Sequence, residues 1–238
     1  MEKELTPVHI QLKKGDISDN VLIGGDPERI IEIAKLLENP KLLWTYRYTV
    51  YSGRYKNKSI TLASHGIGAP SLAIAVEELH ALGGKNFVRL GTCGGMKETD
   101  YGDLVIPDSA FSSGGGTMGE YIGINDSKNA FEPDEKLTTN LIENTKRSGA
   151  KYITGPVFST DAFFVGHQEV MTSKMKMVAI EMECATLFML GRLRKFRTAS
   201  LLLVVDKIME QAKFLSIDEM HRRAKNAASI VLDTLTEY

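Results

Sequence analysis

The sequence predicts an α/β fold: a single domain over residues 1–238, with a central mixed, largely parallel β-sheet flanked by helices. First, short β-branched and apolar runs alternate with amphipathic helical stretches, without repeats or low-complexity tracts. Second, 238 residues are enough to bury a substantial core in one unit. Third, glycines and polar residues cluster directly after the predicted strands, where ligands bind in such sheets.

Each element in the first half of the chain follows from its composition. Residues 21–25 are an apolar strand ending in glycines, and Asp26-Pro27 then begins a helix that extends to about Leu37. Residues 48–55 and 59–64 are rich in strand formers on either side of a polar turn, which predicts a hairpin. The next elements are a helix with apolar spacing at Leu72, Ala75, Val76 and Leu79, strands at 87–91 and 103–106, and a loop-dominated stretch at 110–129.

The second half continues the alternation. Residues 198–205 form a nearly continuous β-branched and leucine run that ends in Asp206, which is typical of a buried strand. The other predicted elements are a helix at 133–148, a strand at 152–158, a loop at 159–168, a strand at 178–180, a helix to about Leu193 and a final amphipathic helix at 217–235.

The net charge and the cysteine content limit the kinds of partner and the cellular compartment that we expect. The formal net charge of −1 gives no electrostatic footprint for nucleic acid or an anionic membrane, so we expect neither as a partner. The first eleven residues have no signal-peptide pattern, and no apolar run approaches the roughly 20 residues that span a bilayer. Cys93 and Cys184 have neither disulfide nor zinc spacing, so free thiols in a cytoplasmic protein are expected.

Residues 87–95, F-V-R-L-G-T-C-G-G, are the most informative stretch. Arg89 stands inside an apolar run, where an unpaired charge would cost several kcal/mol. The following glycine turn combines the Thr92 hydroxyl with backbone N–H groups that can surround an anion. Two interpretations stay open: an oxyanion site, or an arginine that forms a salt bridge with a neighbouring helix above an ordinary turn.

A second arginine follows another strand end. Arg29 lies in the first turn of the helix after Gly25, near the positive end of the helix dipole, where a cation is favoured only if an anion is also bound. An ordinary surface arginine is the alternative. If Arg29 does bind an anion, it would form an anion clamp with Arg89 and Thr92, because the geometry of guanidinium donors matches that of phosphate oxygens.

Acidic and aromatic residues complete the candidate site. Glu183 suits hydrogen bonding to the vicinal hydroxyls of a sugar, and Asp206 ends an apolar strand, where desolvation favours a general acid. Phe163 suits stacking on a flat heterocycle. The alternatives are helix N-terminal acids at Glu181 and Glu183, a helix cap at Asp206 and a core position for Phe163. Phosphate, sugar, heterocycle and proton donor together predict phosphorolysis of an N-glycosidic bond.

At this point the chain resembles the purine nucleoside and uridine phosphorylase family, in its hexameric branch. The resemblance extends from about Pro7 to Leu235, and its most specific part is S-H-G-I-G-A-P-S-L-A-I-A-V-E-E-L at residues 64–79. The motifs G-D-P-E-R at 25–29, R-L-G-T-C-G-G at 89–95, V-A-I-E-M-E at 178–183, and Asp206 follow in the family's order.

The resemblance implies three groups of site residues, two of which include a residue acting in a neighbouring subunit. The residues expected to contact phosphate are Gly25, Arg29, Arg89 and Thr92. Arg47 is the nearest candidate for an arginine that the partner subunit would add to this site. Ribose contacts fall to Glu181, Met182, Glu183 and His9, the last reaching a neighbouring subunit's 5′-hydroxyl. Base contacts fall to Cys93, Gly94, Phe163, Ile180 and Asp206, with Asp206 protonating the purine at N7; Asp206 and Arg89 are the catalytic candidates.

The implied reaction is phosphorolysis of purine nucleosides (inosine, guanosine, adenosine or methylthioadenosine) to free base and ribose 1-phosphate. Inorganic phosphate is the co-substrate, and no metal or organic cofactor is expected. Because His9 would act in trans, a homodimer is the minimum functional unit, and the branch implies a hexamer.

Three alternatives remain. A uridine phosphorylase is the nearest, but residues 159–168 lack the Gln-x-Arg pair of that branch, and Asp206 favours purines. Val205 weakens the purine assignment, since purine-cleaving members often have serine there. A related hydrolase would have little use for Arg29 and Arg89. A non-catalytic nucleoside-binding protein would not need both carboxylates of the site.

Overall fold

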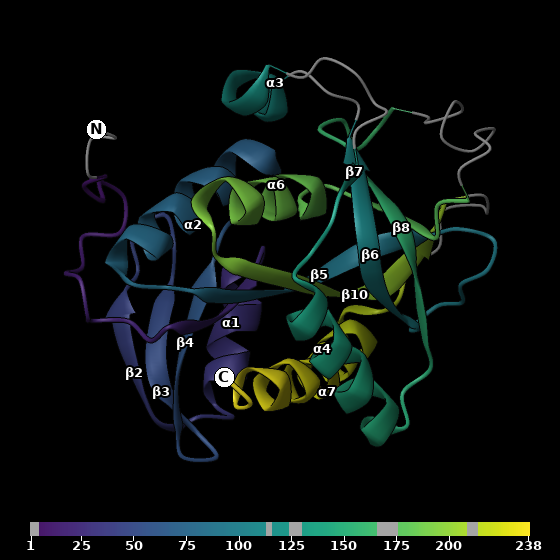
Figure 1. Cartoon of the computed structure of the whole chain (residues 1–238). Helices are drawn as coiled ribbons and strands as arrows, with labels where there is room; N and C mark the ends of the chain where they lie inside the picture. Colours follow the sequence, from purple (N-terminus) through teal and green to yellow (C-terminus); the bar gives the residue numbers. More distant parts are fainter. Residues whose placement is uncertain (1–4, 113–115, 124–129, 166–175, 209–213) are drawn as a thin grey trace.

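The computed structural model has three layers, a β-sheet between two layers of helices (Figure 1). It describes residues 5–112, 116–123, 130–165, 176–208 and 214–238. One face of the sheet is covered by α2 (Ala69–Leu82) and α6 (Cys184–Arg194), and the other by α1 (Pro27–Ala34), α4 (Glu135–Ser148) and α7 (Ile217–Leu235). This confirms the predicted α/β fold with helices flanking a mixed sheet.

Parallel strands form the centre of the sheet. Their order is β4 (Lys58–Ser64), β1 (Asn20–Gly24), β5 (Asn86–Gly95) and β10 (Arg197–Lys207). These strands are largely buried, since helices cover both faces, and this explains their continuous apolar runs. Their carboxyl ends therefore lie at one edge, where Gly24 of β1 leads into the Gly25 turn.

Antiparallel pairings attach the remaining strands on both sides, while β6, β8 and β9 pair with one another in parallel. Beyond β4 lie β3 (Val50–Tyr55) and β2 (Glu38–Trp44). On the other side β10, β6, β8, β9 and β5 pair in a closed ring, because β9 pairs with β5 and β10 pairs with both β5 and β6. The additional strands on this side are β6 (Leu104–Ser112), β7 (Ala130–Phe131), β8 (Tyr152–Ser159) and β9 (Ala179–Glu181).

Alternation along β5 builds the core on both faces of the sheet. Phe87 packs in the apolar cluster that includes α2 and α6, whereas Val88 packs in the cluster with α1, α4 and α7. Successive side chains of a strand point to opposite faces, so two neighbouring residues serve two layers. Arg89 and Leu90 continue the strand toward the edge where the polar residues gather.

Several boundaries differ from the sequence prediction. Strand β2 was not predicted, and α3 (Gly116–Ile122) lies inside the stretch predicted to be mostly loop. Strands β5 and β6 extend past their predicted ends, while α7 begins and ends where predicted. The rest of the predicted loop at 113–115 and 124–129, and residues 166–168 of the loop at 159–168, lie outside the described residues. Among the described residues, no helix is both long and apolar enough to cross a membrane.

Candidate active site

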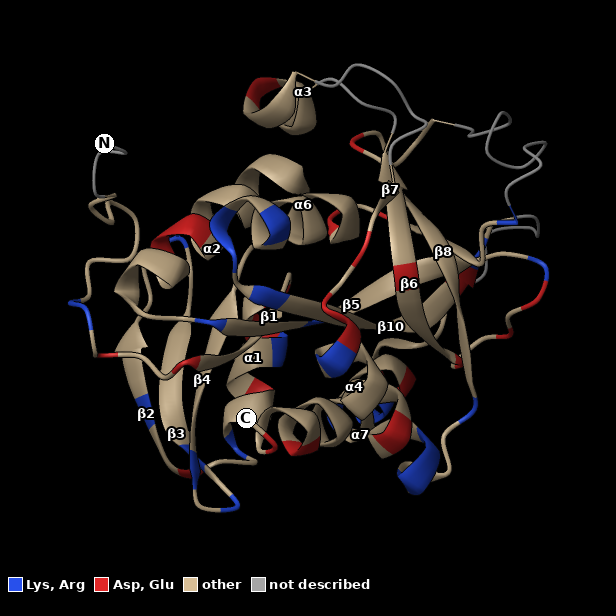
Figure 2. Ribbon diagram, viewed as in Figure 1, with Lys and Arg blue, Asp and Glu red and all other residues tan. Residues whose placement is uncertain are grey.

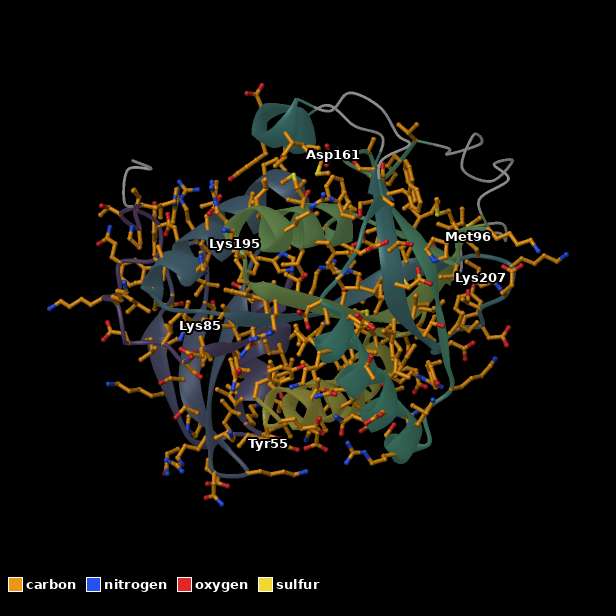
Figure 3. The ribbon with its side chains drawn as sticks, viewed as in Figure 1. Tyr55, Lys85, Met96, Asp161, Lys195 and Lys207 are labelled. Carbon is orange, nitrogen blue, oxygen red and sulfur yellow. The ribbon has the colours of Figure 1, made fainter. Side chains whose placement is uncertain are left out.

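A cavity of about 1190 Å³ lies beyond the carboxyl ends of the central strands. Figure 3 labels Met96, just past the end of β5, close to Lys207, the last residue of β10, whereas Lys85 marks the opposite end of β5. The structure brings most of the predicted site residues to this cavity: Gly25, Arg29, Arg89, Thr92, Cys93, Gly94, Phe163, Ile180, Glu181, Met182, Glu183 and Asp206.

The turn after β1 places Arg29 at the cavity wall. Asp26 is the N-cap of α1 and accepts a hydrogen bond from the Glu28 N–H at 2.9 Å. Gly25 has no room for a side chain, since a Cβ there would lie 2.9 Å from the carbonyl oxygen of Gly66. Arg29 is only 9% exposed, and among the described residues its Nε has no hydrogen-bond partner.

Two guanidinium groups face the same cavity. Burial lowers the pKa of Arg29, and the positive charge of Arg89 lowers it further, against the opposing effect of Asp26. Both side chains remain charged, because the guanidinium does not lose its proton in proteins. Two buried cations that disfavour one another create a site that an anion would stabilise.

Arg89 has carboxylate partners on the α6 side. It forms a short hydrogen-bonded ion pair with Glu183 and lies 3.3 Å from Glu181. Gly91 makes this geometry feasible, since a Cβ at that position would lie 2.3 Å from the Arg89 guanidinium. Burial alone would lower the pKa of Arg89, but the nearby negative groups outweigh burial and raise it. The salt bridge to a neighbouring helix is thus real, and the arginine also lines the cavity.

Glu181 is a structural acid at the start of α6. Its carboxylate accepts hydrogen bonds from the N–H groups of Glu183 at 2.8 Å and Cys184 at 3.0 Å, and a short one from the Ser159 hydroxyl. The helix N-terminal interpretation, left open by the sequence, therefore describes Glu181. Glu181 also lines the cavity, and its assignment to ribose stays a prediction.

Glu183 joins two elements at the cavity wall. One oxygen accepts the N–H of Gly68, at the N-cap of α2, at 2.7 Å, and the other accepts the bond from Arg89. Burial alone would raise the pKa of Glu183, but the adjacent Arg89 overrides burial and lowers it. Glu183 is consequently an anion fixed between the Gly68 loop and β5, beside Met182 on the cavity wall.

The other end of the cavity is built on Gly94. In the sheet Gly94 pairs with Ile180 of β9 on one side and with Asp206 of β10 on the other. A β-bulge between Val204 and Asp206 changes the register there, and such bulges redirect side chains. Asp206 is partly buried, and its Oδ1 accepts the Lys207 N–H at 2.7 Å.

The walls around Gly94 are apolar. Burial raises the pKa of the Cys93 thiol, so Cys93 stays neutral beside Gly94. Phe163 is 60% exposed at the cavity edge and meets Phe164 edge-on, with 5.1 Å between ring centroids. The alternative of a core position for Phe163 is wrong. These walls suit a flat, weakly polar ring.

His9 and Arg47 lie outside this cavity. The Nδ1 atom of His9 is 2.8 Å from a carboxylate oxygen of Glu78 on α2. Arg47 is exposed, and its guanidinium lies 5.4 Å from the centroid of the Tyr46 ring. Neither residue contributes to the cavity of its own chain, in keeping with the expectation that both act in trans, which stays a prediction.

Two residues next to the site were not predicted from the sequence. His65 is fully buried, and burial followed by the nearby Arg89 charge lowers its pKa to about 3, so the ring is neutral. Lys207 lines the cavity, and its Nζ donates a short hydrogen bond to the Thr99 carbonyl. His65 lies inside the motif at residues 64–79, and Lys207 directly follows Asp206, which was the available signal.

Comparisons with known proteins agree with this geometry. The guanosine phosphorylase of Halorubrum lacusprofundi is 32% identical over 96% of this chain and 97% of its own length. The purine nucleoside phosphorylase of Toxoplasma gondii superposes with a TM-score of 0.87 at 27% identity, covering 100% of this chain and 98% of its own. The uridine phosphorylase of Vibrio fischeri gives 0.85 at 28% identity, with 100% of both chains covered.

The family model described as the phosphorylase superfamily matches residues 19–237. This match covers β1 through α7 and every residue found at the cavity. It confirms the resemblance that the motifs indicated. The chain therefore belongs to the phosphorylase superfamily.

Proposed function

We propose that this chain is a nucleoside phosphorylase that cleaves purine nucleosides to free base and ribose 1-phosphate, with inorganic phosphate as co-substrate. One observation carries the proposal: Arg29 and Arg89 both line one cavity, and each charge disfavours the other. A phosphate dianion placed between them would relieve that repulsion. A nucleoside hydrolase, which uses water, would have no need of this pair.

In the proposed reaction, Arg29 and Thr92 hold phosphate near the first turn of α1. Arg89 faces both this anion and Glu183, so it sets the distance between the nucleophile and the sugar. Glu183, kept anionic by Arg89, orients the ribose through a hydroxyl. Phosphate attacks C1′ as the N-glycosidic bond breaks, and its charge stabilises the oxocarbenium-like sugar.

The leaving base lies over Gly94 in this proposal. Asp206 pairs with Gly94 across the sheet and gives a proton to N7 of the purine as the bond breaks. Pyrimidines have no N7, so a role for Asp206 supports purines. Relatives named guanosine phosphorylase and uridine phosphorylase both match, so uridine phosphorolysis is the second candidate.

A substrate panel tests the activity. Inosine, guanosine, adenosine, methylthioadenosine and uridine are incubated with and without phosphate, and free base and ribose 1-phosphate are quantified. We expect purine nucleosides to react only when phosphate is present. Uridine as the sole substrate would favour the second candidate, and release of base without phosphate would indicate a hydrolase.

The variant Asp206→Asn tests the proton donor. It keeps the shape but cannot donate a carboxylic proton, so kcat for inosine should fall about 10²-fold or more. The KM for phosphate should change little, because Asp206 lies on β10, two strands away from β1, which leads to Arg29. Turnover of inosine at the wild-type rate would contradict the role.

A further inference from the structure

Glu78 on α2 holds the N-terminal segment through a dense set of hydrogen bonds. Its carboxylate accepts from the backbone N–H groups of Val8 at 3.0 Å, His9 at 3.0 Å and Ile10 at 2.7 Å. The same carboxylate lies 2.8 Å from Nδ1 of the His9 ring. Figure 2 shows the acidic part of α2 in red, beside the N-terminal segment. Glu78 is only 5% exposed, and its bond from the Ile10 N–H is buried.

The partner of Nδ1 decides where the His9 proton lies. Burial alone would raise the pKa of Glu78, but the bonds from His9, Val8 and Ile10 outweigh burial and lower it. Glu78 is thus an ionised carboxylate, which can only accept hydrogen bonds. Nδ1 must therefore donate. A neutral imidazole carries one ring proton, so Nε2 is left as a bare acceptor.

His9 lies on a surface that adjoins the cavity. Its ring centroid is 6.3 Å from that of Tyr48, whose hydroxyl is 3.1 Å from the Ser71 carbonyl oxygen near the start of α2. The loop just before α2 carries Ile67, which lines the cavity and is 78% exposed. Val8 is also an exposed apolar residue of this surface. A two-fold interface joins the same patch of two copies, and would bring His9 of one copy toward the other copy's cavity.

We propose that Glu78 is a positioning residue that fixes the His9 proton on Nδ1, so that Nε2 accepts a hydrogen bond from a sugar hydroxyl of a nucleoside bound to a second copy of this chain. This inference rests on the proposed function. Without Glu78 the ring would be free to place its proton on Nε2. The bare acceptor would then be lost while His9 itself remained.

The tautomer is measured first, on the unaltered protein. In long-range ¹⁵N–¹H spectra of histidine-labelled protein, with the His9 signals identified by His9→Ala, we expect the Nδ1–H tautomer. In Glu78→Gln one oxygen remains for three backbone N–H groups, so the amide NH₂ faces the ring and favours the Nε2–H tautomer. An Nε2–H tautomer in the wild-type protein would overturn the proposal, whatever the variant does.

Kinetics then test the consequence, with inosine and 5′-deoxyinosine as a matched substrate pair. Glu78→Gln should lower kcat/KM for inosine about 3- to 10-fold, the effect of one neutral hydrogen bond, and leave 5′-deoxyinosine unchanged. In a His9→Ala background Glu78→Gln should have no further effect on the inosine to 5′-deoxyinosine ratio. Equal losses for both substrates would show a merely structural role and overturn the proposal.

Glu77→Gln is the control. Glu77 is the adjacent buried acid on α2, but it binds Arg194, with 3.0 Å between its Oε1 and the arginine Nε. Glu77→Gln should therefore leave the His9 tautomer and the substrate ratio unchanged. If the wild-type protein phosphorolyses no nucleoside, the proposed function fails, and the tautomer spectrum still decides whether Glu78 fixes the proton.

Discussion

Arg89 has two roles, one in stability and one at the cavity, and a measurement of stability alone would not separate them. It neutralises buried Glu183 and Glu181, and it presents positive charge to the cavity. Removing one member of a buried ionic group leaves an uncompensated charge, which costs about 3–5 kcal/mol. Arg29 lines the same cavity, and the structure shows no ion pair for it among the described residues. The two arginines therefore form a natural pair of variants.

Arg29→Met and Arg89→Met should separate phosphate binding from stability. Arg29→Met should weaken phosphate binding by about 1.5–3 kcal/mol while leaving the free energy of unfolding within about 0.5 kcal/mol of wild type. Arg89→Met should weaken phosphate binding and also lower the unfolding free energy by about 3–5 kcal/mol. Phosphate titration and urea unfolding measure the two quantities. Unchanged phosphate affinity in Arg29→Met would contradict the clamp.

The residues of the site were easier to predict than their partners. Arg89 was recognisable because a charge inside an apolar strand requires compensation. Its partner Glu183 is 94 positions away, and one sequence has no signal for such a pairing. Glu181 and Glu183 are two positions apart and both line the cavity, yet only Glu181 accepts hydrogen bonds from the N–H groups at the start of α6. Only the path of the chain into α6 distinguishes them.

At the scale of elements, β5 supplies both halves of the cavity because glycines interrupt its side chains. Gly91 leaves room for the Arg89 guanidinium, and Gly94 leaves room between β9 and β10. A Cβ on Gly94 would lie 2.3 Å from the Ile208 Cδ1, the flexible end of a side chain. The strand can therefore tolerate a methyl group there, but the cavity loses the space.

Gly94→Ala should block the base without unfolding the protein. Ile208 can rotate away, so we expect a loss of about 1 kcal/mol or less in unfolding free energy. The added methyl lies between Ile180 and Asp206, so the KM for inosine should rise about tenfold or more. The KM for phosphate should stay near the wild-type value. Phosphate affinity falling as much as inosine affinity would contradict the assignment of Gly94 to the base.

Hydrophobic periodicity predicted the buried strands and helices well, but it did not predict the strand at the edge of the sheet. Strands β1 and β10 and helix α7 are apolar at regular spacing, which composition reveals directly. Strand β2 contains Asn39-Pro40 and is exposed along much of its length, so nothing in its composition indicates a strand. Pairing with β3 holds it there, and proline is tolerated at a sheet edge. The β5 extension likewise depends on β10.

At the scale of the whole molecule, the site of one chain lacks two of the residues expected to complete it. The cavity gathers residues from β1, β5, β9 and β10, but His9 and Arg47 lie on the neighbouring surface. The His9 ring packs near Tyr48, the residue after Arg47, so the two outlying residues share one surface. Two chains that exchange this surface would each complete the other's cavity.

Mixed dimers test this exchange. His9→Ala/Arg47→Ala removes only the groups given to the partner, and Asp206→Asn removes only a group of the chain's own cavity. Each variant alone should be nearly inactive. A heterodimer of the two has one cavity with all groups intact, so a random equal mixture of dimers should recover about a quarter of wild-type inosine phosphorolysis. Co-expression with two affinity tags isolates the heterodimer. If the heterodimer is no more active than either variant, then His9 and Arg47 do not act in trans. If His9→Ala/Arg47→Ala alone retains wild-type activity, the surface does not contribute to the site at all.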